Sequence, residues 1–285
     1  ITQRALSSFF LLTMSTRLAE ALVTANRVLA MERVFDAFGH VSARLSATHY
    51  VMSRAKAPAT VTEADLMEFD LEGNHENVSF RPYAERMIHG AIYEARPDVR
   101  AVVHSHSYDV VVAGCLFETL RPMTHTCAPI GAVRVWDIRD SFGGATNQLV
   151  RSMAQGRDLA KALREDNAVI MRRHGAVVVG TSLKAAVVTA AYLQHNATMA
   201  IQLAGARRHD LHDDERDTLL DAEIDAAAQL QLSDFALDRA WDDFLARLPD
   251  STAQSTASSS ANDNARTMAS RLPSRWRRQR RARKH

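Results

Sequence analysis

Short apolar runs bounded by polar residues constrain the fold of this chain more than any other feature. Ala168–Met171 and Ala176–Gly180 are two such runs, separated only by a polar segment around His174, and Val99–Val103 is a third. Runs of this length and composition are typical of buried strands. Because segments with helical spacing of apolar residues lie between and around them, the sequence predicts one α/β domain with mixed strands and flanking helices.

Helices are predicted from the spacing of apolar residues and from residues that favour helix ends. Pro82 is a helix-start signal for the segment that follows it, and Pro97 lies just beyond the end of that segment. The predicted helices cover residues 16–34, 83–95, 146–163 with Thr146 as the cap, and 182–203, and two amphipathic segments lie within residues 215–248.

Charge is distributed unevenly along the chain. Residues 249–285 hold nine of the 35 basic residues and two of the 33 acidic residues, which leaves 26 basic and 31 acidic residues in the remainder. This mildly acidic body argues against a nucleic-acid-binding domain. The composition of residues 249–285 predicts a disordered Arg-rich tail that could bind polyanions nonspecifically. We therefore expect a disordered lead at residues 1–14, one domain over 15–248 and the tail.

The two cysteines, Cys115 and Cys127, do not form a C-x-x-C pair. We expect both to be buried thiols in a reducing cytoplasm, with a disulfide between them as the alternative. No uninterrupted apolar run approaches the roughly 20 residues that cross a bilayer, so no membrane span is expected.

His104 and His106 form an H-x-H pair at the end of the predicted strand that begins at Val99. Side chains two residues apart on a strand point to the same face, so both imidazoles can approach one ion. The alternative for the pair is two ordinary polar residues. His174 lies in a polar turn between two apolar strands, where Gly175 indicates a tight backbone. Three histidine ligands leave an open coordination position, which is typical of a catalytic metal site.

Glu85 is the fourth candidate, in the first turn of the helix predicted after Pro82. Taken alone, an acid at this position is explained by the helix dipole, which favours negative charge near a helix N-terminus. The sequence positions alone therefore leave two explanations for Glu85, compensation of the helix dipole and a role in the metal site. His89, one helical turn further on, either orients Glu85 or packs.

A longer pattern joins these residues and resembles the signature of the class II aldolase/adducin family over roughly residues 16–205. It consists of Glu85-x3-His89-x2-Ile92-Tyr93-x2-Arg96-Pro97-Asp98-x2-Ala101-Val102-Val103-His104-Ser105-His106, Arg173-His174-Gly175 and Gly39-His40-Val41-Ser42. The resemblance implies a three-layer α/β/α fold around a mixed, mainly antiparallel sheet. It also implies a homotetramer with the active site at a subunit boundary.

By this resemblance, His104, His106 and His174 correspond to the metal ligands of the family, and Glu85 corresponds to its catalytic acid/base. One divalent ion per subunit, which could be Zn, Mn, Fe or Co, would act as a Lewis acid. It would stabilise the enolate or carbanion that remains when a carbon–carbon bond breaks. Glu85 would deliver or remove the proton at carbon.

Several residues around this core depart from the pattern of the family's sugar-phosphate aldolases. His40 stands in place of an Asn, Arg54 and Lys56 lie where a Thr-Gly turn is expected, and Tyr83 begins a pair that replaces two serines. These changes favour a small-molecule carboxylate, because Arg54 could bind it bidentately and Tyr83 could stack on a planar ring. The alternative for Arg54 and Lys56 is a solvated surface cation. His40 and His125 are further candidate substrate-binding residues.

The altered residues resemble the family branch of decarboxylases that act on hydroxylated aromatic or pyridine dicarboxylates. The leading hypothesis is therefore a metal-dependent decarboxylase of such a dicarboxylate. The second is an aldolase that cleaves a small hydroxy-carbonyl compound or a sugar phosphate, and the third is a non-catalytic adducin-like binding module. A metal-dependent oxygenase on the same scaffold is a fourth.

Overall fold

The structure is a computed structural model, and it describes residues 16–144, 146–207 and 217–249. The predicted lead and, apart from residue 249, the predicted tail lie outside the described residues. By its internal contacts the chain divides into residues 1–245 and 246–285. Of the second unit only residues 246–249 are described, and the first two of them end the last helix.

Within the described part of residues 1–245, a single eight-stranded sheet has the order β3-β2-β1-β4-β8-β7-β6-β5. All neighbouring strands are antiparallel except β6 and β7, which are parallel. The prediction of a mixed, mainly antiparallel sheet is therefore confirmed. The strands are β1 (His40–Arg44), β2 (His49–Ser53), β3 (Leu66–Asp70), β4 (Ala101–Ser105), β5 (Thr119–Leu120), β6 (Val133–Trp136), β7 (Ala168–Met171) and β8 (Gly175–Gly180).

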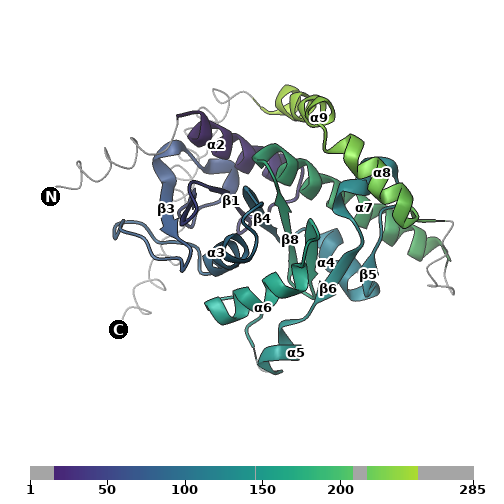
Figure 1. Ribbon diagram of the computed structural model, residues 1–285, viewed down its shortest axis with the longest axis horizontal. Helices are drawn as coiled ribbons and strands as arrows, with labels where there is room; N and C mark the ends of the chain where they lie inside the picture. Colours follow the sequence, from purple (N-terminus) through teal and green to yellow (C-terminus); the bar gives the residue numbers. More distant parts are fainter. Residues whose placement is uncertain (1–15, 145, 208–216, 250–285) are drawn as a thin grey trace, which may run out of the picture. The chain divides into compact units, whose positions relative to one another are not determined.

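Helices cover both faces of this sheet, which gives the predicted three layers (Figure 1). On one face, α3 (Arg86–Ala95) and α6 (Met153–Leu163) pack together over alternate strand residues such as Val102 and Val179. On the other face lie α2 (Thr16–Met31), α4 (Tyr108–Leu116) and α7 (Leu183–Arg207). The remaining helices are α5 (Ile138–Phe142), α8 (Asp221–Gln231) and α9 (Asp234–Arg247), with short 3-10 turns at Pro58–Thr60, Glu63–Asp65 and His125–Ile130. Among the described helices, none is long and apolar enough to cross a lipid bilayer.

Two predicted helix starts are wrong. The helix expected from Tyr83 begins at Arg86, because the residues after Pro82 form a turn. The helix expected from Thr146 begins at Met153, where Ser152 accepts the backbone N–H of Gln155 at 3.3 Å as a true cap. The residues between form a loop, in which Gln148 has a positive φ of 66° that no helix allows.

Helix α4 was not predicted, because its Val-rich sequence has a weak intrinsic preference for helix. It is stabilised instead by packing against β7, β8 and α7. A Cβ atom at Gly114 would lie 2.5 Å from the side chain of Ile170, so glycine permits this close contact. Cys115, on the outer side of α4, is an exposed free thiol, which corrects the expectation that both cysteines are buried. Cys127 is buried and also free.

Candidate metal centre

Two histidines lie where β4 ends and β8 begins. His104 is near the end of β4, and its Nδ1 donates to the carbonyl oxygen of Ala176 on β8 at 3.2 Å. His174 directly precedes β8. A Cβ atom at Gly175 would lie 1.8 Å from the carbonyl oxygen of Ser105, so only glycine lets the two strands approach this closely. The tight backbone at Gly175 is what brings His174 beside the H-x-H pair.

The side chains of Glu85, His104, His106 and His174 converge on one point. Each can offer one ligand atom, and these atoms all lie within 4.8 Å of one another. Nε2 of His104 lies 3.2 Å from Nε2 of His106. Oε2 of Glu85 lies 3.6 Å from Nε2 of His104 and 3.4 Å from Nε2 of His174. The structure thus brings together the four residues that the sequence singles out for metal chemistry.

The proton positions on His104 and His106 leave room for a cation between the rings. Nδ1 of His104 faces a carbonyl oxygen, and Nδ1 of His106 lies 3.1 Å from Oδ1 of Asp36, so both Nδ1 atoms carry the proton. In neutral rings the two Nε2 lone pairs then face each other at 3.2 Å, which is repulsive without a bound cation. In a tetrahedral zinc site with Zn–N distances of about 2.0–2.1 Å, two ligand nitrogens lie about 3.3 Å from each other. The donor set therefore fits a divalent ion.

Asp36 supports His106 from a tight turn. Its Oδ1 also accepts the backbone N–H groups of Phe38 at 2.8 Å and Gly39 at 3.0 Å, which fixes the carboxylate. A Cβ atom at Gly39 would lie 2.4 Å from the ring of Phe35. Burial raises the pKa of Asp36, but these hydrogen bonds and His106 lower it on balance. An ionised carboxylate behind a ligand histidine orients the ring and fixes its tautomer.

Glu85 occupies the N-cap position of α3, yet its side chain makes no capping hydrogen bond. Its Oε1 accepts the backbone N–H of Val150 at 2.9 Å, which leaves Oε2 facing the histidines. Burial raises the pKa of Glu85, whereas His104 and His174 lower it by more, so the group is a carboxylate. Because the side chain is buried and turned toward the cluster, compensation of the helix dipole does not explain it.

Two aromatic rings lie beside the cluster. His40 is opposite His104 in the β1–β4 register, with ring centroids 5.0 Å apart. The ring of Tyr83 lies 4.5 Å from that of His40, and its hydroxyl donates to the backbone carbonyl of Lys56. Burial raises the pKa of Tyr83, which stays neutral. His89 bonds to His40 at 2.7 Å rather than orienting Glu85.

Arg54 continues the same row of residues across the sheet. The antiparallel register of β1 and β2 brings residue 54, directly beyond β2, opposite His40. Nε of Arg54 donates to Oδ1 of Asp65 at 2.8 Å, and Nζ of Lys56 donates to Oδ2 of the same carboxylate at 2.6 Å. Both cations are therefore held in ion pairs rather than being solvated alone.

His125 is not brought to this site within the chain. It begins the 3-10 turn His125–Ile130, and its side chain is exposed. The carbonyl oxygen of Pro129 in this turn accepts Nδ2 of Asn167, which precedes β7, whereas His174 follows β7. The turn therefore lies near the start of β7, whereas His174 lies beyond its end. A role of His125 in the site stays a prediction.

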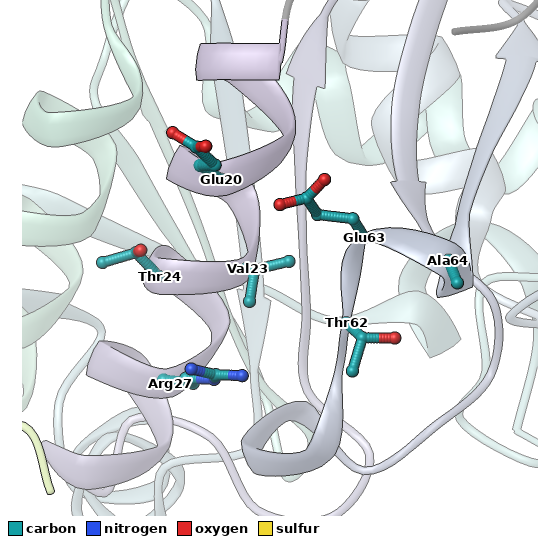
Figure 2. A pocket seen from close by; sticks show the side chains of 7 residues that line it. All are labelled: Glu20, Val23, Thr24, Arg27, Thr62, Glu63 and Ala64. Atoms are coloured by element: carbon teal, nitrogen blue, oxygen red, sulfur yellow. The ribbon is translucent and has the colours of Figure 1, made fainter. Parts of the chain in front are cut away.

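A surface pocket lies apart from the cluster, between α2 and the segment that follows the first 3-10 turn (Figure 2). Glu20 and Glu63 face each other across it, and Arg27 extends into it from α2. None of the four cluster residues lines this pocket. Its lining is Glu20, Val23, Thr24, Arg27, Thr62, Glu63 and Ala64.

Sequence reasoning missed several partners of the cluster. The backbone of Val150 carries no side-chain signal, so its contact with Glu85 appears only in the fold. Asp36 could have been found, because an Asp two and three residues before Phe38 and Gly39 is typical of a side-chain turn. Ser42 and Tyr93 lie within the recognised motifs, but nothing in the sequence indicates that they contact each other.

Comparisons with known proteins agree with this architecture. The sequence profile of the class II aldolase and adducin N-terminal domain matches residues 20–201. A decarboxylase named tropJ from Talaromyces stipitatus is 30% identical over 206 residues, which are 65% of this chain and 76% of that protein. A 3,4-dihydroxyphthalate decarboxylase from Arthrobacter keyseri is 29% identical over 219 residues, covering 71% of this chain and 86% of that protein. Two other relatives are matched over only about half of their own length.

A solved structure adds a relative with a different name. L-fuculose 1-phosphate aldolase from Glaciozyma antarctica superposes with a TM-score of 0.59 and 25% identity, over 77% of this chain and 83% of that one. The two decarboxylases and the aldolase named here are lyases, whereas one of the relatives matched over half of its length is named an oxygenase. Class II aldolases use a divalent metal ion, and the cluster of Glu85 and three histidines could bind one. The profile match, the sheet order and the recognised motifs together show that this chain belongs to the class II aldolase/adducin family.

Proposed function

We propose that the chain is a divalent-metal-dependent lyase that decarboxylates a hydroxylated aromatic or heteroaromatic dicarboxylate. The observation that carries the proposal is the convergence of three imidazoles and Glu85, whose ligand atoms lie within 4.8 Å of one another. Such a donor set suits Zn, Mn, Fe or Co, one ion per subunit. The names of two relatives support decarboxylation as the reaction.

His104, His106 and His174 would bind the ion, which acts when bound as a Lewis acid for the negative charge left by loss of carbon dioxide. Glu85 is the group that moves the proton. Its Oε2 would take the proton from the substrate hydroxyl as the substrate binds. When the carbon–carboxylate bond breaks, its electron pair stays on the ring carbon, and Oε2 returns the proton there.

His40, Tyr83 and Arg54 would bind the remainder of the substrate. The ring of Tyr83 offers a wall for a planar ring, and His40 lies beside it with ring centroids 4.5 Å apart. Arg54 would hold the carboxylate that is not lost. Since its Nε is bonded to Asp65, it would use its two terminal nitrogens, which match a carboxylate bidentately.

The test is an assay of the purified full-length chain with 3,4-dihydroxyphthalate, after loading with Zn²⁺ or Mn²⁺. We expect release of carbon dioxide that stops when a chelator removes the metal and returns when the metal is restored. Aldehyde release from a hydroxy-carbonyl compound, without carbon dioxide from any hydroxylated dicarboxylate, would overturn the proposal.

An aldolase is the second candidate, and the likeness to an L-fuculose 1-phosphate aldolase favours it. The same donor set could stabilise the charge left by either reaction. Against it, bulky rings at His40 and Tyr83 line the space beside the cluster. Incubation with L-fuculose 1-phosphate and detection of aldehyde separates the two candidates.

A non-catalytic adducin-like binding module is the third candidate. Such a module has no need of metal ligands, whereas this chain keeps the three histidines and Glu85 in one cluster. Metal analysis after gentle purification tests it. Stoichiometric divalent metal supports the enzyme, and a chain that binds none supports the module.

We infer in addition that the protein is a homo-oligomer, and the family resemblance favours a tetramer. We also infer that it is a cytoplasmic protein. Phe38 and Tyr108 flank the cluster in sequence and are 69% and 79% exposed, so this edge carries apolar side chains that a second copy could cover. A second copy is also the route by which His125 could reach a site. Analytical ultracentrifugation measures the oligomeric state.

A further inference from the structure

Four buried side chains form a chain of hydrogen bonds that ends beside the cluster. The hydroxyl of Tyr93 lies 2.9 Å from Oγ of Ser42, and this Oγ lies 2.6 Å from Nδ1 of His89. Nε2 of His89 lies 2.7 Å from Nδ1 of His40. All four side chains are at most 2% exposed, so the hydrogen bonds between them are shielded from water.

His40 is the end of this chain that faces the candidate site. Its ring lies 5.0 Å from that of the metal-ligand candidate His104 and 4.5 Å from that of Tyr83. Because Nδ1 is bonded to His89, Nε2 is the ring nitrogen left for a bound molecule. Whether Nε2 donates or accepts is decided by the rest of the chain.

Burial lowers the pKa of His89 to about 3, so this ring is neutral and carries one proton. Two arrangements of protons are then open. In the first, Tyr93 donates to Ser42, Ser42 donates to Nδ1 of His89, and Nε2–H of His89 donates to Nδ1 of His40. The proton of His40 then sits on Nε2. In the second, every bond is reversed, and the proton of His40 sits on Nδ1.

The surroundings of Tyr93 distinguish the two arrangements. In the second arrangement Ser42 donates to the tyrosine oxygen, so the tyrosine proton needs another acceptor. Within the part of the chain that the structure describes, no hydrogen-bond acceptor other than Ser42 lies at this hydroxyl. Arg44, whose guanidinium lies 4.6 Å from the centre of the ring, has only donors. A buried hydroxyl proton without an acceptor is costly, so the first arrangement is favoured.

We propose that Tyr93, Ser42 and His89 hold His40 as its Nε2–H tautomer, which donates a hydrogen bond to a carboxylate or phenolate oxygen of the substrate. The proposal deepens the proposed function and rests on it for the identity of the ligand. His40 is then a specificity-determining residue, because it requires an acceptor oxygen beside the metal position. Ser42 and His89 are positioning residues that act through His40, and Tyr93 donates to Ser42 at the far end of the chain of hydrogen bonds.

The tautomer can be measured without any substrate. Full-length protein labelled with ¹⁵N-histidine and loaded with Zn²⁺ gives two-bond proton–nitrogen correlations that separate protonated from unprotonated ring nitrogens. The signals of His40 are identified by their loss in His40→Gln. We expect the proton on Nε2, and a proton on Nδ1 would overturn the proposal.

Two variants of the chain test the cause of the tautomer. Ser42→Ala removes the hydroxyl that is bonded to both Tyr93 and His89, so His40 should become a mixture of tautomers. Tyr93→Phe removes one hydroxyl but leaves Ser42 free to donate to His89, so the Nε2–H tautomer should persist. If Ser42→Ala keeps the tautomer of the unmodified chain, the hydrogen-bonded chain does not set it.

The donor role is tested by the affinity of the Zn²⁺-loaded protein for 3,4-dihydroxyphthalate. His40→Leu should weaken binding by about ten- to a hundredfold, since a hydrogen bond to a charged group is lost. His40→Gln should restore most of it, because its amide N–H replaces Nε2–H. His49→Leu is the matched control. His49 is the first residue of β2, at the end of that strand remote from Arg54, and this variant should bind normally. Equal binding by His40→Leu would overturn the donor role.

The two failures are distinguishable. If the unmodified chain binds Zn²⁺ but not the dihydroxyphthalate, both the proposed substrate class and the donor role toward it are overturned. The tautomer of His40 is measured without ligand and stands or falls independently.

Discussion

The backbone N–H of Val150 holds Oε1 of Glu85 at 2.9 Å, so Oε2 is the oxygen directed at the histidines. A carboxylate anchored at one oxygen can gain and lose a proton at the other without moving. Val150 lies in the loop before α6, so the late start of that helix at Met153 is what delivers this N–H to the site. The position of this loop therefore determines which oxygen of Glu85 faces the histidines.

Glu85→Gln should lower kcat by about 10²- to 10⁴-fold, the usual contribution of a positioned acid or base. Glutamine keeps an oxygen for Val150, so the fold should persist, as thermal denaturation can check. Glu94→Gln, on the exposed side of the same helix and paired with Arg157, is the control and should retain normal turnover. Normal turnover in Glu85→Gln at full metal content would contradict the acid/base role.

Asp36→Ala should weaken metal binding by about ten- to a hundredfold, because carboxylates behind ligand histidines typically contribute that much. Competition with a metal-binding dye measures the affinity. Asp36→Asn keeps an acceptor for Phe38, Gly39 and His106 and should lose less. Asp70→Ala removes a similar turn carboxylate, bonded to Asn74, away from the cluster and should bind metal normally. Equal affinities in all four proteins would show that Asp36 does not support His106.

Gly175→Ala should destabilise the protein by about 1–3 kcal/mol, the usual cost of forcing an extra carbon into packed structure. The new Cβ would lie 1.8 Å from the carbonyl oxygen of Ser105, so the end of β4 must move, and metal affinity should fall with stability. Gly205→Ala, in α7 with nothing near the added carbon, should instead be neutral or stabilising by up to about 1 kcal/mol. Urea denaturation of both variants makes the comparison, and a Gly175→Ala protein of full stability and metal affinity would refute it.

The sequence predicts those parts of the site that depend on local geometry. The H-x-H pair follows from the two-residue period of a strand, and His174 follows from a polar turn between apolar strands. The partners of these residues come from distant segments that meet only after folding. Asp36 reaches His106 across β1 and β4, and no spacing in the sequence encodes that distance.

Intrinsic helix propensity also predicts the wrong secondary structure where tertiary packing or a single capping residue determines it. The Val-rich segment of α4 is helical because α7 and the sheet bury it. The segment predicted as helix from Thr146 begins instead as a loop, and Ser152 with Gln155 forms the cap of the helix that starts at Met153. In both places the misjudged segment adjoins the site: α4 follows His106, and the loop supplies Val150.

The ion pairs of Asp65 predict a defined dependence of stability on pH. Burial raises the pKa of Asp65, but hydrogen bonds from Lys56, Thr62 and Arg54 lower it well below its usual value on balance. A depressed pKa contributes stability that is fully present above the unfolded value of about 3.9 and is lost progressively as the pH falls from there to the lower pKa of the folded state. Asp65→Asn should therefore be less stable at pH 7, by about 1–3 kcal/mol for charge-assisted hydrogen bonds.

The stability deficit of Asp65→Asn relative to the unmodified chain should shrink by about 1 kcal/mol between pH 6 and pH 3. At pH 3 the unmodified chain has a protonated Asp65 when unfolded but an ionised one when folded, so its own free energy of unfolding falls. Urea denaturation of both proteins across this range measures the difference, in which the titration of all other groups cancels. The partners are 35% and 26% exposed for Arg54 and Lys56, so added salt should reduce the deficit at pH 7. A deficit that stays constant down to pH 3 would mean that Asp65 stabilises the turn through neutral hydrogen bonds alone.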